Sequence, residues 1–409
     1  MHSIRRKGVY TMYKKFIHFF KQDAVFTISL ILAVISCFFV QPSAEYIGYI
    51  DFRVLALLFC LMTVIGGYSN IGFFHKLGKT LLNKAASIRS LAAVLVFLCF
   101  FSSMVITNDV ALITFVPFTI LILNMIHRND KLILLIVLET IAANLGSMLT
   151  PLGNPQNLYL YTISGMNLGE FVLTLLPYTA ISFLLLAILI WRFPKEAVSI
   201  ELDEDDTSVI SKGKLIIYTG LFLLCLLVVL HIFPFQLVLA IVFIVMLFTD
   251  RKVLYSVDYI LLLTFVCFFI FIGNMKNIPA VHTLLSQIIS GHEFASGVLA
   301  SQCISNVPAA ILLSGFTTEI APLLIGVNVG GLGTLIASLA SLISYKYYTK
   351  AISTSSTTIH NTKTSSPLTQ TASLSTPNTS GRYMYIFTAY NVLFLAILVA
   401  AYYLLTLLP

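Results

Sequence analysis

The chain has 409 residues, of which 58% are apolar and only 10% are charged, and its formal net charge is +7. A soluble globular domain carries about 25% charged residues, so this composition excludes a water-soluble protein of this size. The excess of basic residues does not indicate a nucleic-acid partner. The lysines and arginines lie in short segments between apolar runs, as they do in membrane proteins.

Apolar runs follow one another along the chain, many close to the ~20 residues that cross a bilayer as a helix. They are continuous in Leu, Ile, Val and Phe rather than alternating with polar residues, which favours helices over a β-barrel. We therefore predict an all-α polytopic membrane protein embedded in the lipid bilayer. Its predicted segments are 24–40, 51–68, 91–106, 110–127, 131–163, 170–191, 214–231, 235–249, 257–274, 294–316, 319–345 and 384–408.

Two of the apolar stretches are interrupted by short polar sequences. The stretch 91–127 is broken by Thr-Asn-Asp at 107–109, and the stretch 294–316 is broken by Ser-Asn-Val-Pro at 305–308. Each is predicted to be a re-entrant hairpin of two helices that meet at a polar tip. Such an open backbone is tolerated at membrane depth only where protein buries it or where it lines a cavity.

The positions of the basic residues test this arrangement. With both hairpins returning to their starting side, nine full spans remain, and the N-terminus is cytoplasmic while the C-terminus is outside. Of the 24 Lys and Arg residues, 22 then fall in segments on the inside of the cell membrane, as the positive-inside rule requires. These inside segments are 1–23, 69–90, 128–131, 192–214, 250–256 and 346–383.

The second half of the chain repeats the first. Residues 50–72 align with 257–279, matching an Asp, a Cys, a Gly and an Asn, and residues 144–155 align with 328–338. In the predicted topology the paired segments run in opposite directions, which makes an inverted repeat, a construction common in secondary transporters. Chance similarity between two Leu- and Phe-rich segments is the alternative, and the matched polar residues argue against it.

The repeat divides the chain into four parts. A cytoplasmic N-terminal segment (1–23) precedes the first repeat (24–191), and an inside loop with a linker helix (192–234) leads to the second repeat (235–408). Each repeat holds a hairpin and a Gly-rich broken helix, and the second also holds a Ser- and Thr-rich loop that we predict to be disordered. These parts are the hairpins 91–127 and 294–316, the broken helices 131–163 and 319–345, and the loop 351–382.

The hairpin tips and broken helices are the predicted binding site. A helix opened in the membrane exposes carbonyl groups that coordinate cations and N–H groups that hold anions. Small polar residues also pack membrane helices together, but matched clusters at breaks in both halves favour a function. The candidate residues are Ser103, Thr107, Asn108, Asn144, Gly153 and Asn154 in the first half, and Ser301, Ser305, Asn306, Thr334, Ala337 and Ser338 in the second.

Two acidic residues are candidate proton carriers, because ionisable groups within a membrane are commonly functional. Asp109 follows the Asn of the first tip and could bind a cation, carry a proton or cap the helix that follows it. Glu139 lies about 12 Å into its helix, close to mid-depth, and could carry a proton or be a buried structural group.

Motifs for other chemistry are absent from the sequence. No nucleotide-binding GxxxxGK[ST] loop, HExxH or GxSxG motif is present, and the six cysteines form no CxxC pair. We therefore predict no enzyme activity, no cofactor and no metal other than sodium, with sodium or a proton as the coupling ion. The alternative from a different functional class is a channel or a membrane scaffold that transports nothing.

At its tips and broken helices the chain resembles the citrate-transporter-like superfamily, which includes divalent anion/sodium symporters, arsenite-efflux permeases and a class of sodium/proton antiporters. The resemblance rests on the paired tips and on the stretches NLGSMLTPLGNPQN and GVNVGGLGTLIAS, and it covers nearly the whole chain except two loops. It implies an elevator mechanism in a homodimer. It also implies one sodium site at Ser103, Thr107, Asn108 and Gly153, and a second at Ser301, Ser305 and Asn306.

The chain departs from the symporter pattern at both tips. The symporter tips end in Thr, which helps to hold substrate carboxylates, whereas this chain has Asp109 and Val307 there. The expected function is secondary transport of a small, anionic solute, a carboxylate or inorganic anion, coupled to sodium or protons. An arsenite or antimonite efflux permease and a sodium/proton antiporter are the alternatives.

Overall fold

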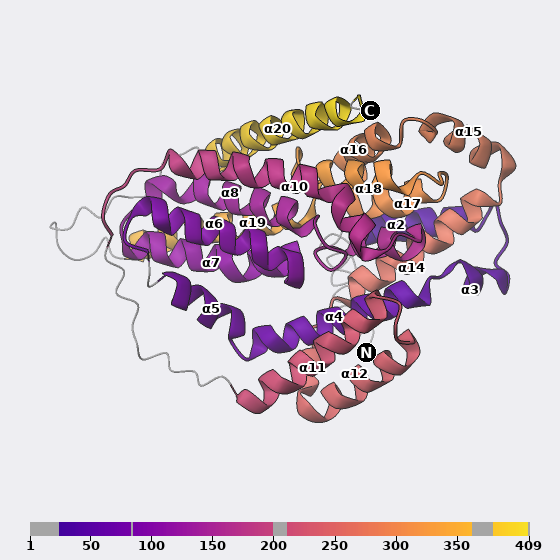
Figure 1. The fold of residues 1–409 in the computed structure, drawn as a ribbon, viewed down its shortest axis with the longest axis horizontal. Coiled ribbons are helices and arrows are strands. Elements are labelled where there is room, and N and C mark those ends of the chain that lie inside the picture. The colour runs from indigo at the N-terminus through magenta and orange to yellow at the C-terminus, as the bar shows by residue number, and fades with distance from the viewer. Residues whose placement is uncertain (1–23, 83–84, 199–210, 362–378, 408–409) are drawn as a thin grey trace, which may run out of the picture.

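The computed structural model describes residues 24–82, 85–198, 211–361 and 379–407. This part of the chain is all-helical and contains no strand, which confirms the predicted fold class (Figure 1). The helices are α2 (Ala24–Ser36), α3 (Glu45–Tyr49), α4 (Phe52–Asn70), α5 (Phe73–Leu82), α6 (Ile88–Ile106), α7 (Asn108–Met125), η1 (Asn129–Lys131), α8 (Leu132–Ser147), α9 (Pro155–Ser164), α10 (Leu168–Trp191), α11 (Lys212–Val229), α12 (Phe235–Thr249), α13 (Arg251–Tyr255), α14 (Tyr259–Lys276), α15 (Pro279–Ile289), α16 (Glu293–Ile304), α17 (Asn306–Ser314), α18 (Ile320–Val329), α19 (Leu339–Asn361) and α20 (Thr379–Thr406).

Seven helices of the described chain are long and apolar enough to cross a membrane: α4, α6, α7, α10, α11, α14 and α20. They confirm a multi-pass membrane protein. The two predicted hairpins differ in size, since α6 and α7 have 19 and 18 residues whereas α16 and α17 have 12 and 9. Each helix of the first hairpin is therefore long enough to cross the bilayer, whereas the helices of the second hairpin are too short to do so.

The helix starts follow capping residues in the sequence. The carboxylate of Asp51 accepts hydrogen bonds from the N–H groups of Arg53 and Val54 at the start of α4. Asp258, its partner in the sequence repeat, accepts from the N–H of Leu261 at the start of α14. These acidic caps satisfy N–H groups that have no partner within the helix.

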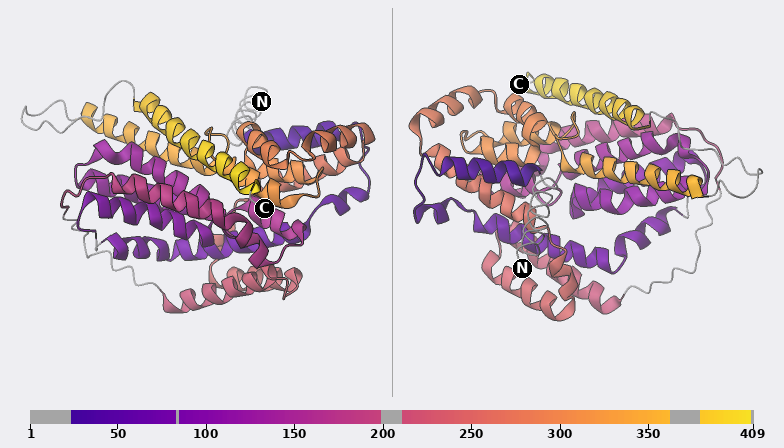
Figure 2. Two further views of the ribbon diagram at one scale, coloured as in Figure 1. Left: turned by 45° about the horizontal axis from the view of Figure 1, so that its top comes forward. Right: turned by 180° about the vertical axis from the view of Figure 1, so that it is seen from behind.

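The helices pack as two groups that lie side by side (Figures 1 and 2). We call α2, α4, α11, α12 and α14 the frame group, and α6 to α10 with α16 to α20 the hairpin group. Within the hairpin group, α6 packs along α8 and α16 packs along α18. The main contacts between the groups are those of α14 with α17 and α4 with α9, while α5 links α4 to α6 and α7.

Helices of the two sequence halves are exchanged within the frame group. Helix α2 of the first half packs on α14 of the second, and α12 of the second half packs on α4 of the first. Helix α11, the linker, also packs on α4. The two halves are therefore interlocked, and neither can bury its apolar helices without the other.

Short helices were missed in the sequence because they lie in segments that we read as loops. Helices α5 and α15 follow α4 and α14, at equivalent places in the two halves, and each leads into a hairpin. Helix is present at both ends of the segment 351–382, since α19 continues to Asn361 and α20 begins at Thr379. Residues 351–361 contain no Gly or Pro, so an existing helix continues through them without a new nucleation step. The segment 1–23, most of the acidic inside loop and residues 362–378 lie outside the described residues.

Asp250, between α12 and α13, ties three parts of the frame group together. Its Oδ2 accepts hydrogen bonds from Asn70 of α4 (2.7 Å) and from Lys214 (3.1 Å) and Tyr218 (3.3 Å) of α11. Burial would raise the pKa of Asp250, but the hydrogen bonds from Lys214 and Asn70 and the lysine charge outweigh it and hold the pKa below its ordinary value. The carboxylate therefore stabilises the fold in its ionised form.

Replacement of Asp250 by Ala should destabilise the protein by about 2 kcal/mol, because three donors lose their charged acceptor. The thermal midpoint of the detergent-solubilised protein measures the loss. A group with a lowered pKa contributes above its unfolded pKa, so the difference from wild type should shrink as the pH falls below about 4. The control is Asp130→Ala, because Asp130 pairs with Arg128 and Lys131 at 55% side-chain exposure and should matter by less than about 1 kcal/mol. Equal effects of the two substitutions would contradict the role given to Asp250.

Candidate functional site

The two hairpins turn on single residues with the same unusual backbone. Thr107 joins α6 to α7 with φ 72° and ψ 149°, and Ser305 joins α16 to α17 with φ 73° and ψ 154°. This region of φ and ψ is essentially reserved for glycine, and a residue held there costs about 1 to 3 kcal/mol. The surrounding structure must therefore fix both turns, as it does at many functional sites.

Each turn is fixed by a backbone hydrogen bond to the broken helix of its own half. The N–H of Asn108 donates to the carbonyl of Gly153 at 3.0 Å, and the N–H of Asn306 donates to the carbonyl of Ala337 at 3.0 Å. These are the residues that the sequence repeat paired. The breaks themselves, 148–154 after α8 and 330–338 after α18, lie against the tips, where the tips bury their open backbone.

The broken helices of the two halves hold each other through reciprocal side-chain bonds. Asn144 of α8 accepts a hydrogen bond at its Oδ1 from Ser338 in the second break (2.9 Å), and Asn328 of α18 accepts at its Oδ1 from Asn154 in the first break (3.2 Å). Both bonds join residues that are equivalent in the repeat. All four side chains are at most 5% exposed, so these polar groups satisfy one another without water.

The first tip is joined to this network as well. The Asn108 side chain donates to Asn144 Oδ1 at 3.0 Å. Asn328 also donates to Asn157 Oδ1 at 2.7 Å, and the Asn157 amide in turn donates to the carbonyls of Met148 and Thr150 in the first break. A buried amide network therefore covers the carbonyl groups that the opened helix leaves exposed.

Two glycines bring the hairpins close to the broken helices. A Cβ at Gly146 would lie 2.1 Å from the carbonyl oxygen of Phe100 in α6, and one at Gly330 would lie 2.8 Å from the Cα of Val298 in α16. Gly146 and Gly330 are equivalent in the repeat. Only a residue without a side chain permits this approach of helix to helix, as at many membrane-helix contacts.

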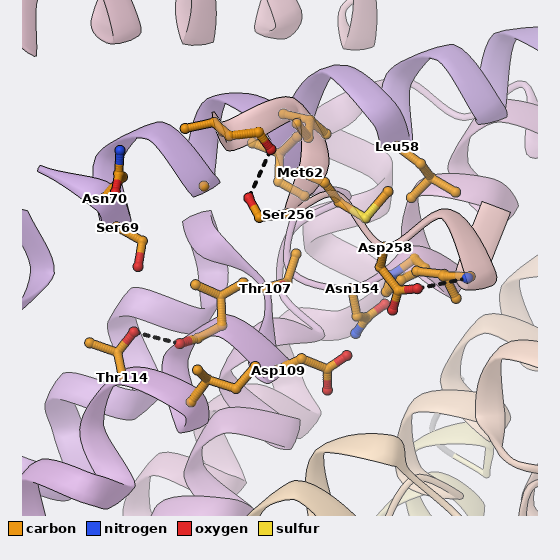
Figure 3. Close-up of a pocket in the computed structure, with 18 of the residues that line it drawn as sticks. Leu58, Met62, Ser69, Asn70, Thr107, Asp109, Thr114, Asn154, Ser256 and Asp258 are labelled. Carbon is orange, nitrogen blue, oxygen red and sulfur yellow. Dashed lines mark hydrogen bonds between the residues drawn. The ribbon is translucent and has the colours of Figure 1, made fainter. Parts of the chain in front are cut away.

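A cavity of about 670 Å³ lies between the first tip and the frame group. Its walls come from α4, the region around α13 and the start of α14, the beginning of α7 and the break before α9 (Figure 3). Hydroxyl and amide groups line it together with apolar side chains of α4. The polar lining includes Thr107, Asp109, Thr114, Asn154, Ser69, Asn70, Lys252, Ser256 and Asp258.

The charges at the cavity are mixed. The carboxylates of Asp109, on the hairpin group, and Asp258, at the start of α14 in the frame group, point into the same space (Figure 3). Lys252 of α13 also lines the cavity and adds one positive charge. Helices α7 and α9 also begin at this cavity, so the positive ends of their dipoles face it. The cavity can therefore attract an anion through its backbone while its two carboxylates favour a cation nearby.

The second tip lies apart from the cavity. Ser305, Asn306 and Val307 are buried, whereas Thr107 and Asp109 of the first tip are only half-buried. The two tips are alike in backbone but differ in access, since α14 of the frame group packs on α17.

The other predicted residues divide into three kinds. Ser103 and Ser301 are buried and donate to carbonyls of their own helices, Phe100 and Gly297. Glu139 is fully buried within the hairpin group, away from the cavity. Thr334 is exposed and does not reach the tip; it donates to the carbonyl of Gln302 in α16, as its repeat partner Thr150 donates to that of Met104 in α6.

Sequence reasoning missed several members of the network. Asn157, Asn328, Ser147 and Ser341 all bond to predicted site residues, the first three to Asn154 and the last to Asn144. The repeat carried a signal for three of them, since Asn328 is the partner of Asn144, and Asn157 and Ser341 are partners at the same spacing, whereas Ser147 is paired with Gly331. Asp258 and Lys252 reach the cavity from a different helix group, which no local pattern reveals.

Comparison with known proteins places these features in a group of transporters. The sequence profile of the citrate transporter family matches residues 17–343. An uncharacterized transporter of Methanocaldococcus jannaschii is 34% identical over 304 residues, which cover 74% of this chain and 82% of its own length. An inner membrane protein of Escherichia coli is 31% identical over 337 residues, 81% of this chain and 89% of its own. A silicon efflux transporter of Oryza sativa is 32% identical over 160 residues, 38% of this chain and 32% of its own.

The backbone strain at Thr107 predicts an unusual response to glycine. Thr107→Gly should leave the thermal midpoint unchanged or raise it, because the relief of roughly 1 to 3 kcal/mol of strain offsets the entropy that glycine adds to the unfolded chain. Thr162→Gly, in regular helix α9, is the control and should lower the midpoint, by about 1 kcal/mol in free energy. A comparable loss in both variants would show that Thr107 is not strained.

The close approach at Gly146 predicts the opposite response to alanine. Gly146→Ala should reduce the yield of monodisperse protein, because the added methyl group overlaps the Phe100 carbonyl and must push α6 away from α8. Gly220→Ala in α11 is the matched control, since a Cβ there meets nothing within 4 Å. Size-exclusion profiles of the two variants in detergent give the comparison, and equal profiles would contradict the close packing.

Proposed function

The chain belongs to the citrate transporter family, and on that premise we propose that it is a secondary active transporter of a small anionic solute, a carboxylate or an inorganic anion, coupled to sodium or protons. That the chain is a transporter and not an enzyme follows from the family and from the relatives that are named as transporters. The solute, the coupling ion and the mechanism are the proposed parts.

We propose that the two halves are inverted repeats. The observation that supports this most strongly is the reciprocal pair of hydrogen bonds, Asn144 with Ser338 and Asn328 with Asn154. The equivalent turns at Thr107 and Ser305 and the exchange of α2 and α12 between the halves agree with it. Such repeats place a substrate site between them, near the middle of the membrane.

The proposed mechanism is an elevator movement of the hairpin group against the frame group. The hairpin group is tied internally by buried hydrogen bonds across both halves, whereas few helices connect it to the frame group. A body that is rigid inside and loosely attached outside can move as a unit. The cavity lies at the boundary between the groups, so the movement would change its access.

We place the coupling cation at the tips and the solute in the adjoining cavity. At the first tip the cation would meet oxygen atoms of Ser103, Thr107, Asn108 and Gly153, and at the second those of Ser301, Ser305 and Asn306. The starts of α7 and α9, with Lys252, would attract the anion. The carboxylates of Asp109 and Asp258 would repel a polycarboxylate unless a bound cation or proton offsets their charge.

Two alternatives draw on specific observations. The carboxylates at the cavity also suit a sodium/proton antiporter, in which Asp109 itself exchanges the ions. The similarity to a silicon efflux transporter, limited to 38% of the chain, favours an efflux permease for an oxyacid such as arsenite or antimonite. We further propose a homodimer in the cell membrane, with the N-terminus cytoplasmic and the C-terminus outside.

Transport by the purified protein in liposomes tests the proposal. Internal pH and uptake are followed while sodium, citrate, succinate and arsenite are added one at a time. Movement of an anion that depends on sodium or protons supports the symporter, whereas a pH change driven by sodium alone identifies an antiporter. Gradient-independent, non-saturable flux would indicate a channel and overturn the proposal.

The substitution Asp109→Asn separates the symporter from the antiporter. It removes the negative charge but keeps the shape, so an anion symporter should retain most of its uptake while an antiporter that titrates this carboxylate should lose exchange by at least about tenfold, as expected on removal of an essential acid–base group. Asp130→Asn, at the surface, serves as the control for charge removal. Equal loss for every solute and ion would leave Asp109 with a structural role only.

A further inference from the structure

Glu139 is an acidic residue with no counter-ion inside the hairpin group. Its side chain is fully buried, and within the described part of the chain no salt bridge reaches it. Burial strongly disfavours an ionised carboxylate that has no paired charge. The protonated form of Glu139 is therefore favoured in this arrangement.

The hydroxyl of Thr119, in α7, donates its hydrogen bond to this carboxyl group. Threonines in these helices commonly donate to the carbonyl four residues back, as Thr114 does to Val110 and Thr140 does to Ile136. Thr119 instead donates to Glu139 Oε1, two residues after Pro117 interrupts the bonding of α7. The hydroxyl is thus aimed at Glu139 rather than satisfied within its own helix.

The second carboxyl oxygen of Glu139, Oε2, accepts no hydrogen bond from the described residues. Helix α20 packs on α8, and its Tyr383 carries a buried hydroxyl beside that of Thr140, the residue that follows Glu139. The other titratable groups in this region are Cys99 of α6 and two tyrosines of α19, Tyr345 and Tyr348, whose rings pack on Tyr383. An unpaired buried acceptor and a buried hydroxyl therefore both lie where α8 meets its neighbouring helices.

A row of polar side chains, here called the polar seam, leads from Thr140, the residue after Glu139, toward the first tip. Along it, α8 contributes Thr140 and Asn144, and α19 contributes Ser341 and Ser344. The Thr140 and Ser344 hydroxyl oxygens lie 2.8 Å apart, the Asn144 amide lies 3.4 Å from Ser341, and Asn144 accepts from the tip residue Asn108. Since α8 and α19 belong to different halves, the seam runs along the contact between them.

We propose that Glu139, Thr119 and Tyr383 form an exchangeable proton-binding site within the hairpin group. Thr119 holds one oxygen in both protonation states, and Tyr383 donates to Oε2 once the proton has left, so that the ionised form is stabilised by two hydroxyl groups. The seam transmits the change in hydrogen bonding to Asn108. The inference rests on the proposed function, in which it makes the proton a coupling ion.

Infrared difference spectroscopy of the full chain in lipid tests the site without any solute, because a protonated carboxyl group and a carboxylate absorb at different frequencies. Spectra recorded between acid and alkaline pH should show a carboxyl band that disappears reversibly. The band should be missing in Glu139→Gln and present in Asp109→Asn. Glu139→Asp keeps a carboxyl group at this position and should therefore still show a titrating carboxyl band. This variant provides the test if Glu139→Gln folds poorly.

Tyr383→Phe separates an exchangeable site from a fixed structural proton. Loss of the hydroxyl removes a donor to the ionised carboxylate, so the band should persist to more alkaline pH than in wild type. A band that survives in Glu139→Gln, or one that never titrates in wild type, overturns the inference. Because no transport is measured, such a result leaves the proposed transport function intact, and a failed liposome assay leaves this test valid.

Discussion

The structure depends on how the protein provides hydrogen bonds to the backbone N–H and C=O groups that its two broken helices leave unpaired in the interior. Two helices are broken at 148–154 and 330–338, and lipid offers no hydrogen bonds to the groups set free. The Asn157 amide, which donates to the carbonyls of Met148 and Thr150, and the tip bonds to the carbonyls of Gly153 and Ala337 supply some of them. The reciprocal side-chain bonds of Asn144 with Ser338 and of Asn328 with Asn154 hold the two breaks together. Because each half completes the other, these breaks can exist only where both halves meet.

The same constraint explains why the hairpin group is a compact body. Its hairpins must approach the broken helices closely, which places Gly146 and Gly330 at the contacts and strains the turns at Thr107 and Ser305. The frame group carries none of these breaks and is held by apolar packing and by the polar contacts of Asp250. A transporter needs both properties, a fixed site and a support against which the site can move.

Charge distinguishes this chain from a simple carrier of carboxylates. Asp109 replaces the hydroxyl residue expected at the first tip, and the frame group adds Asp258 to the same cavity. Helix dipoles and Lys252 oppose these carboxylates. In the proposed function, this balance would make a bound cation or proton part of the substrate site, since it would decide whether an anion can enter. Glu139, deep in the hairpin group, offers a second place where protonation could act on the same tip.

The sequence alone determined the all-helical membrane class, the two interruptions and the pairing of residues between the halves, because hydropathy and repeat spacing are local signals that survive without a structure. The helices α5 and α15, and the helical ends of the loop near Asn361 and Thr379, escaped it, since no long apolar run marks them. Tertiary structure alone decided that Thr334 donates to the Gln302 carbonyl of α16, that Asp258 and Asp109 line one cavity, and that Thr119 donates to Glu139. These are contacts between helices far apart in the chain, and side-chain direction at such contacts is set by how the groups pack.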